Sequence, residues 1–203
     1  MAEILLASGN QHKVEELRFL LSKTDWQVKS LHDFPDYVAP PEDGDSFLAN
    51  AAIKAVHAAR YSGMLTMADD SGLQVEALAG APGIYSARFA GEDKNDEANN
   101  SKLLHLLENV PAAGREAQFV CAIVIAGPCG VVFETQGFCR GQISFSPAGE
   151  EGFGYDPIFF LPQYGCTMAQ LPAEKKNSIS HRADALQKVL PVLKNFKNVA
   201  NKS

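Results

Sequence analysis

Short apolar runs and longer stretches of regularly spaced apolar residues alternate along the chain. Compact apolar runs bounded by turn residues are typical of buried strands, and apolar residues three or four positions apart are typical of amphipathic helices. The first pattern predicts strands over residues 3–7, 26–30, 65–68, 116–126, 131–139, 142–145 and 158–161, with 73–78 extending the third. The turn residues 127–130 separate the two longest of these strands, which predicts a long hairpin.

The helical spacing predicts the second kind of element. The predicted helices cover residues 11–22, residues 96–108, a stretch from a cap at Asp45 or Ser46 to about Tyr61, and a C-terminal stretch from Ser180 that Pro191 bends or ends. Helices and strands interleave without repeats or linkers. The chain is therefore predicted to be one α/β domain over residues 1–203, built on a mixed β-sheet.

Composition narrows the class of protein. The chain has 203 residues, of which 46% are hydrophobic, enough for one sizeable core. A net charge of −6 without a basic tract argues against general nucleic-acid binding. No apolar stretch approaches the roughly 20 residues that a bilayer span requires, the start does not resemble a signal peptide, and the four cysteines form no metal-binding pair. These features predict a soluble cytoplasmic protein with no membrane or nucleic-acid partner.

Four short polar clusters, far apart along the chain, contain residues suited to binding a metal–triphosphate and recognising a base. They are residues 8–13, 69–72, 153–157 and 180–182. In the first, a glycine lies between a predicted strand and a helix that carries Lys13 in its first turn. Such a helix N-terminus offers unpaired N–H donors to a phosphate, although the glycines of a Walker A loop are missing. An ordinary turn with a solvated lysine is the alternative.

Asp69 and Asp70 follow an apolar run. Side chains alternate along a strand, so only one of the two carboxylates is expected to point into a shared site. Mg²⁺ usually takes one or two carboxylates together with substrate phosphates, and Glu42 in the preceding acidic loop is a candidate for the second. A turn built from Asp, Ser and Gly is the alternative. Lys54, one turn after Asn50, either extends to water or reaches into the site.

The last two clusters combine rings, a carboxylate and cations. Phe153 and Tyr155 can stack on a base, and Asp156 can accept a hydrogen bond from a base N–H, but a surface loop anchored in the core has the same composition. His181 and Arg182 open the last predicted helix, where the macrodipole disfavours cations. A ligand that accepts hydrogen bonds in front of this helix would offset that cost.

Together these segments resemble the inosine/xanthosine triphosphate pyrophosphatase family, and its bacterial branch in particular. The resemblance extends from Ile4 to the C-terminal helix, and its most specific segments are residues 68–73, 80–88, 152–159 and 178–182. It implies an α/β fold with a long mixed β-sheet flanked by helices and two lobes around a central cleft. It also implies a homodimer that depends on Mg²⁺.

The resemblance assigns roles residue by residue. Asp70 is expected to be the catalytic base and a metal ligand, and Glu42 the second metal ligand. Phosphate contacts are expected from residues 8–13 and Lys54, and nucleotide and base contacts from the later clusters. The complete set of expected substrate-binding residues is Ser8, Gly9, Asn10, Gln11, His12, Lys13, Lys54, Ser71, Phe153, Gly154, Tyr155, Asp156, Lys176, His181 and Arg182.

The expected reaction is hydrolysis of non-standard purine nucleoside triphosphates (ITP, dITP and XTP) to the nucleoside monophosphate and pyrophosphate. Two alternatives stay open. One is a pyrimidine-directed house-cleaning pyrophosphatase, against which residues 178–182 argue. The other is a non-catalytic nucleotide sensor, against which the presence of Glu42 and Asp70 argues.

Overall fold

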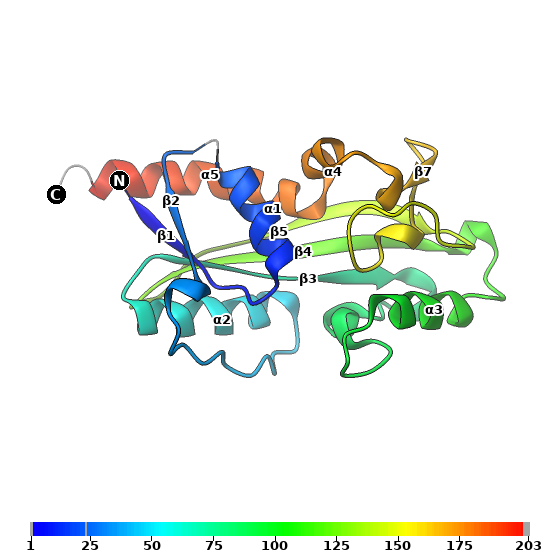
Figure 1. Cartoon of the computed structure of the whole chain (residues 1–203), viewed down its shortest axis with the longest axis horizontal. Coiled ribbons are helices and arrows are strands. Elements are labelled where there is room, and N and C mark those ends of the chain that lie inside the picture. Colours follow the sequence, from blue (N-terminus) through cyan, green and yellow to red (C-terminus); the bar gives the residue numbers. More distant parts are fainter. Residues whose placement is uncertain (1, 23, 201–203) are drawn as a thin grey trace. The chain divides into compact units, whose positions relative to one another are not determined.

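Helices and strands interleave along the chain (Figure 1), as the apolar pattern predicted. The computed structural model describes residues 2–22 and 24–200, without the side chains of residues 197–200. The strands are β1 (Glu3–Leu6), β2 (Gln27–Ser30), β3 (Thr66–Val75), β4 (Glu116–Gly127), β5 (Gly130–Ile143), β6 (Phe159–Leu161) and β7 (Cys166–Thr167). The α-helices are α1 (Gln11–Leu21), α2 (Phe47–Ser62), α3 (Asp96–Leu106), α4 (Ala173–Ile179) and α5 (His181–Ala200).

The strands form one seven-stranded sheet in the order β2-β1-β3-β4-β5-β6-β7. β1 pairs in parallel with β2 and with β3, whereas β6 pairs antiparallel with β5 and with β7. The two-residue connection between β4 and β5 is the predicted hairpin turn, because only antiparallel neighbours can be joined so tightly. The predicted α/β class and mixed sheet are confirmed.

Three predicted boundaries were wrong. β3 continues through Asp69-Asp70-Ser71-Gly72 instead of ending there, because Leu73 and Val75 keep the alternation and are buried in the core. β5 extends to Ile143 and so includes the start of the separate strand predicted after it. α5 runs past Pro191 to Ala200, so the predicted end at Pro191 was wrong and the alternative bend stays a prediction. A proline removes only one backbone donor, and the buried Val189 and Leu193 hold the helix on either side.

The chain divides into two compact units. The first comprises residues 1–70, 121–137 and 182–203, and the second comprises residues 71–120 and 138–181. Each has its own apolar core. The core of the first unit combines residues of β1, α1, β3, β4 and α5, and the core of the second combines residues of β3, α3, β4, β5 and β6. Two lobes were predicted, whereas the cleft predicted between them stays a prediction.

Within the first unit, helices lie on both faces of the strands. The core residues of α1 and α5 pack against Ile4, Leu6 and Met67, which all project from one face of the sheet because of the two-residue alternation. α2 lies on the opposite face (Figure 1). Ser46, one of the two predicted candidates, caps α2, and its side chain accepts a hydrogen bond from the Ala49 N–H. The stripe of alanines in α2 is buried.

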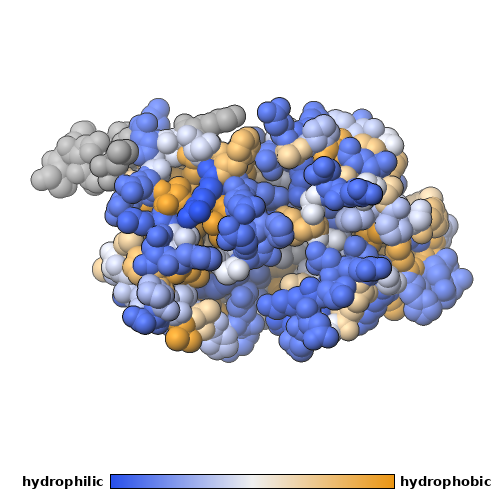
Figure 2. Space-filling model, viewed as in Figure 1, coloured by the Kyte–Doolittle hydropathy of each residue, from blue (hydrophilic) through white to orange (hydrophobic). Residues whose placement is uncertain are grey.

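None of the helices in the described part of the chain is long and apolar enough to cross a bilayer. The face drawn in Figure 2 is covered mostly by hydrophilic residues, with apolar residues scattered among them.

Candidate active site

Asp69 and Asp70 project from opposite faces of β3 and contact different helices. Asp69 Oδ2 lies 3.1 Å from Lys13 Nζ on α1 and 3.9 Å from Arg182 Nε on α5. Asp70 Oδ1 lies 3.5 Å from Lys54 Nζ on α2. The strand alternation that separates the two carboxylates was expected from the sequence.

The acidic loop before α2 brings a second carboxylate to Lys54. Lys54 Nζ lies 3.0 Å from Glu42 Oε2 as well as 3.5 Å from Asp70 Oδ1. Asn50 Nδ2 donates to Asp70 Oδ2 at 3.2 Å, and Asn50 Oδ1 accepts from the Gly44 N–H at 2.8 Å. A Cβ at Gly44 would lie 2.8 Å from Asn50 Oδ1, so only glycine allows this approach. We call Glu42, Asn50, Lys54 and Asp70 the acidic corner.

Proton affinities in the acidic corner reflect burial and neighbouring charge. Burial raises the pKa of Asp70, and Lys54 and Lys13 oppose this rise only in part. Burial lowers the pKa of Lys54, but Asp70, Asp69 and Glu42 outweigh it, so the net pKa is raised. Lys54 therefore remains charged at neutral pH. A carboxyl group with raised proton affinity beside a fixed cation is typical of catalytic bases.

The donor set of the acidic corner fits Mg²⁺. Carboxylate oxygens of Glu42 and Asp70 both reach a single ammonium nitrogen, so hard oxygen donors converge at one point. Residues 2–22 and 24–200 contain no group of three or more His, Cys, Asp or Glu side chains that could hold a metal on its own. Mg²⁺ typically needs only one or two carboxylates when substrate phosphates complete its shell, and the corner supplies that number.

The turn from β1 to α1 lies in the same unit as the acidic corner. Asn10 is the N-cap of α1, and its Oδ1 accepts from the Lys13 N–H at 3.2 Å. Ser8 Oγ accepts from the Asn10 N–H at 3.3 Å. The exposed residues of this turn are Gly9, Asn10, Gln11 and His12. Since the first turn of α1 contains no acidic residue, its N–H groups and Lys13 favour an anion.

Arg182 is buried inside the first unit. Its Nη1 lies 2.7 Å from Glu16 Oε2 on α1, and only 3% of the residue is exposed. Burial lowers its pKa, but Glu16 and Asp69 outweigh that effect and the net pKa is raised. The guanidinium therefore links α5 to α1 and β3. Its predicted contact with a base stays a prediction.

The loop of residues 152–156, which we call the nucleobase loop after its predicted role, gathers a carboxylate, an ammonium and a ring in the second unit. Asp156 Oδ2 lies 2.8 Å from Lys176 Nζ and accepts from the Phe153 N–H at 3.0 Å. Lys176 Nζ lies 4.8 Å from the centre of the Phe153 ring. Gly152 has a φ of 84°, and a Cβ there would collide with the Asp156 carboxylate. The loop conformation therefore depends on this glycine.

The two aromatic residues of the nucleobase loop differ in environment. The Tyr155 ring is buried in the core, and its hydroxyl donates to the Ser86 carbonyl at 2.8 Å. Burial, with a smaller effect of Asp96, raises the Tyr155 pKa. Phe153 is only half-buried. Tyr155 thus anchors the loop, and Phe153 is the ring that keeps a partly exposed surface.

The remaining predicted site residues of the second unit are Ser71 and His181. Ser71 follows Asp70 in β3 and is half-buried. The buried imidazole of His181 stacks on Phe119, with ring centroids 4.9 Å apart and planes 15° from parallel. His181 therefore packs at the edge of the core of this unit.

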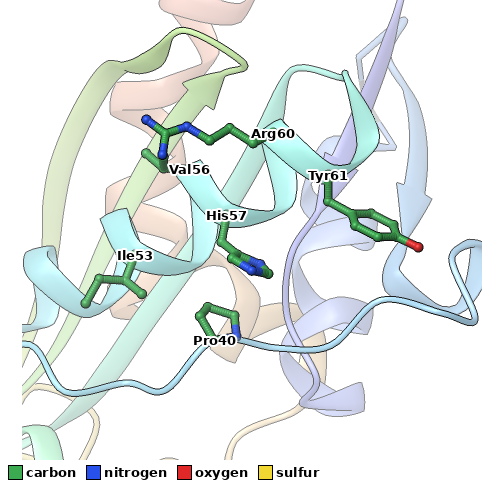
Figure 3. Close-up of a pocket in the computed structure, with 6 residues that line it drawn as sticks. All are labelled: Pro40, Ile53, Val56, His57, Arg60 and Tyr61. Atoms are coloured by element: carbon green, nitrogen blue, oxygen red, sulfur yellow. The ribbon is translucent and has the colours of Figure 1, made fainter.

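A pocket of about 460 Å³ lies on the outer side of α2 (Figure 3). In Figure 3, His57 points from α2 toward Pro40 of the preceding loop. The Tyr37 hydroxyl lies 3.1 Å from His57 Nδ1, and its ring packs edge-on against Tyr61. The loop that carries Glu42 is thus attached to α2 by an aromatic contact as well as by its ion pair with Lys54. The pocket is lined by Pro40, Ile53, Val56, His57, Arg60 and Tyr61, none of them predicted site residues.

Several side chains that hold the predicted site residues were missed in the sequence. The helical spacing correctly placed Asn50 on the same face of its helix as Lys54. Its hydrogen bond with the Gly44 N–H, however, depends on the conformation of the loop. Glu16 is 166 residues from Arg182, so no local spacing links the two. The other missed contacts come from Asp96 and Asn100 of α3, which bind the nucleobase loop across more than fifty residues of sequence.

Comparison with known proteins identifies the family. The model of the Ham1 family matches residues 4–192, and the chain belongs to this family. The dITP/XTP pyrophosphatase of Desulforamulus reducens is 52% identical over 191 residues, covering 94% of this chain and 95% of that protein. The protein of the same name from Geobacillus kaustophilus is 50% identical, with 93% of both chains covered.

The fold agrees with solved structures of the same family. The structure of the Staphylococcus aureus Ham1 protein superposes with a TM-score of 0.85 at 44% identity, covering 95% of this chain and 98% of that chain. The resemblance inferred from the polar segments is therefore confirmed.

Proposed function

We propose that this protein hydrolyses non-standard purine nucleoside triphosphates (ITP, dITP and XTP) to the nucleoside monophosphate and pyrophosphate, and so removes them from the nucleotide pool. The observation that carries the proposal is the convergence of Glu42 and Asp70 on Lys54. It occurs in a chain that is about half identical to proteins named dITP/XTP pyrophosphatases.

The first unit performs the phosphate chemistry. Lys13, Lys54 and the N-terminus of α1 bind the triphosphate. Glu42 and Asp70 would hold Mg²⁺, which would offset charge on the phosphates and on the leaving pyrophosphate. Asp70 orients a water molecule toward the α-phosphorus and accepts its proton, while the bond from this phosphorus to the bridging oxygen breaks. Asn50 and Lys54 keep the Asp70 carboxylate oriented for this step.

The second unit selects the base. Hypoxanthine and xanthine present a 6-oxo acceptor beside an N1–H donor, whereas adenine presents a 6-amino donor beside a bare N1. Lys176 offers donors and Asp156 offers an acceptor 2.8 Å apart, which matches the 6-oxo pattern and leaves groups unpaired against adenine. Phe153 provides a ring face for stacking. Sites built on such hydrogen bonds discriminate by up to about 10⁴–10⁵-fold.

A pyrophosphate-release assay with ITP, dITP, XTP, GTP, ATP, dTTP and UTP tests this function. We expect turnover of the first three with Mg²⁺ and its loss when the metal is chelated. A preference for dTTP or UTP would instead identify a pyrimidine-directed pyrophosphatase. Tight ITP binding without release of pyrophosphate would identify a nucleotide sensor.

Two further features belong to the proposal. One is a homodimer, which the family resemblance implies and which light scattering of the purified protein tests directly. The other is a cytoplasmic location, which the composition predicts and which fractionation of the native cells tests.

A further inference from the structure

The backbone of Gly154, in the middle of the nucleobase loop, is held on both sides by side chains of α3. Asp96 Oδ2 accepts from the Gly154 N–H at 2.7 Å, and Asn100 Nδ2 donates to the Gly154 carbonyl at 3.0 Å. Asp96 and Asn100 are four residues apart, so they lie on one face of the helix, one turn from each other. Together they satisfy both polar groups of a single residue. We call this pair the α3 clamp.

The loop needs such a clamp because its own sequence favours disorder. Gly152 and Gly154 both adopt positive φ, at 84° and 64°. Glycines lose more conformational entropy on ordering than any other residue. Phe153 directly precedes Gly154, and Asp156 follows it by two residues. We propose that both contact the base. Holding the Gly154 peptide therefore restricts where the Phe153 ring and the Asp156 carboxylate lie.

Asn100 reaches the loop from a buried position. The residue is only 7% exposed, and within the described residues its Oδ1 makes no hydrogen bond. The bond from Nδ2 to the Gly154 carbonyl is the contact that Asn100 makes with the loop.

We infer that Asp96 and Asn100 are positioning residues for base selection, which act by fixing the Gly154 peptide so that Phe153 and Asp156 meet a 6-oxopurine in the correct geometry. The inference rests on the proposed function. The inference predicts that loss of the clamp weakens binding of the nucleotide and reduces the selectivity between bases. Turnover of bound substrate should change little, because both clamp bonds go to Gly154 of the nucleobase loop, which we propose to contact the base and not the phosphates.

The neighbouring Asn99 provides a matched control. It lies on the same helix, is 2% exposed, and makes two side-chain hydrogen bonds to backbone, as the clamp does. Asn99 Oδ1 accepts from the Ala90 N–H at 2.6 Å, and Nδ2 donates to the Ala87 carbonyl at 3.2 Å. These bonds hold residues 87–90 and do not reach the nucleobase loop. Asn99→Ala should therefore lower stability as much as a clamp variant without the same effect on base choice.

The test compares Asn100→Ala, Asp96→Ala, Asp96→Asn and Asn99→Ala by kcat and KM for ITP and ATP and by melting temperature. Losing a hydrogen bond that orders the loop should raise KM for ITP about tenfold and lower the ITP-to-ATP ratio of kcat/KM about tenfold. We expect kcat to stay within about twofold. Asp96→Asn keeps an acceptor oxygen and should behave nearly as the wild type.

Two results would overturn the inference. If Asn100→Ala and Asp96→Ala lower the melting temperature as Asn99→Ala does but leave KM and the ITP-to-ATP ratio unchanged, the clamp only stabilises α3. If Asp96→Asn is as impaired as Asp96→Ala, the hydrogen-bond acceptor is not what matters. Calorimetric binding of ITP and ATP to the same variants separates a failure of the clamp from a failure of the proposed function. A wild type that binds ITP but releases no pyrophosphate refutes the function and leaves the clamp testable by affinity, and one that binds neither nucleotide refutes both.

Discussion

Asp69 and Asp70 are adjacent in β3, yet each is bound to a different lysine: Asp69 Oδ2 lies 3.1 Å from Lys13 Nζ, and Asp70 Oδ1 lies 3.5 Å from Lys54 Nζ. The Asp69 side chain is completely buried, whereas 12% of the Asp70 side chain is exposed. One strand thus supplies an internal carboxylate that links helices and a neighbouring carboxylate that a ligand can reach. This separation makes the roles of the two residues testable.

Asp70→Asn should abolish most activity and preserve the fold. Asparagine keeps the shape of the side chain and its contact with Asn50 but cannot accept the proton of the attacking water. Positioned general bases contribute about 10²–10⁴-fold to rate, so kcat for ITP should fall by a factor in this range. Steady-state pyrophosphate release measures the loss, and circular dichroism checks the fold.

Asp69→Asn is the matched comparison, with the opposite expected outcome. It removes the buried carboxylate that lies 3.1 Å from Lys13 Nζ, whereas Arg182 keeps its ion pair with Glu16, and breaking a buried pair on one side costs about 3 kcal/mol. Urea unfolding should show a clear loss of stability. Near-normal kcat in Asp70→Asn, or a greater loss of kcat in Asp69→Asn, would mean that the catalytic carboxylate was assigned to the wrong residue.

Mg²⁺ should stabilise the protein through the acidic corner even without nucleotide. A ligand that binds only the folded state raises its stability by RT ln(1 + [L]/Kd), so the melting temperature should rise as Mg²⁺ is titrated into chelator-treated protein. Glu42→Gln and Asp70→Asn should each reduce the rise. Glu92→Gln, which changes an exposed carboxylate of the second unit, should leave it intact. An equal rise in all four proteins would place metal binding elsewhere.

The raised pKa of Asp70 predicts how stability of the metal-free protein varies with pH. Because burial raises this pKa above its ordinary value of 3.8, the folded state retains the proton at pH values where the unfolded chain has lost it. The resulting stability is present below the unfolded pKa and is lost as pH rises through the folded pKa. The loss cannot occur in Asp70→Asn.

The free energy of unfolding of Asp70→Asn minus that of the wild type, measured in chelator, should therefore increase from about pH 3.5 toward neutral pH. Urea titrations at several pH values provide this difference. A difference that decreases with pH would show that attraction to Lys54 and Lys13 dominates over burial.

The sequence predicted best those features that depend on local periodicity. The core faces of α1 and α2, the Ser46 cap and the divergence of Asp69 and Asp70 all follow from the repeat of a helix or a strand. Contacts between distant segments could not be predicted in this way. No local sequence pattern indicates that Glu16 pairs with Arg182 or that the Asn50 side chain accepts a hydrogen bond from the Gly44 N–H. The same holds for the continuation of β3 through a sequence suited to a turn. Tertiary packing decides each of these.

Arg115 makes stabilising hydrogen bonds between segments that are distant in the sequence. The residue is 2% exposed, and its guanidinium donates to the carbonyls of Leu107, Ile143 and Ser144 at 2.7, 2.7 and 2.8 Å. It thereby joins the segment after α3 to the end of β5 in the second unit. Burial lowers the Arg115 pKa, but an arginine stays charged at neutral pH.

Arg115→Met should remove the guanidinium donors from these carbonyls, although the Leu107 carbonyl keeps the Val110 N–H as a donor, and should destabilise the protein by about 3 kcal/mol. Arg115→Lys restores the charge but not the fork of donors, so it should recover only a small part of the loss. Since no proposed catalytic or base-contacting residue bonds to Arg115, kcat and the ITP-to-ATP ratio should match the wild type well below the melting temperature. Urea unfolding with a parallel pyrophosphate assay measures both. Full recovery by lysine would show that charge alone matters here, and a changed ITP-to-ATP ratio would show that Arg115 acts on the nucleobase loop.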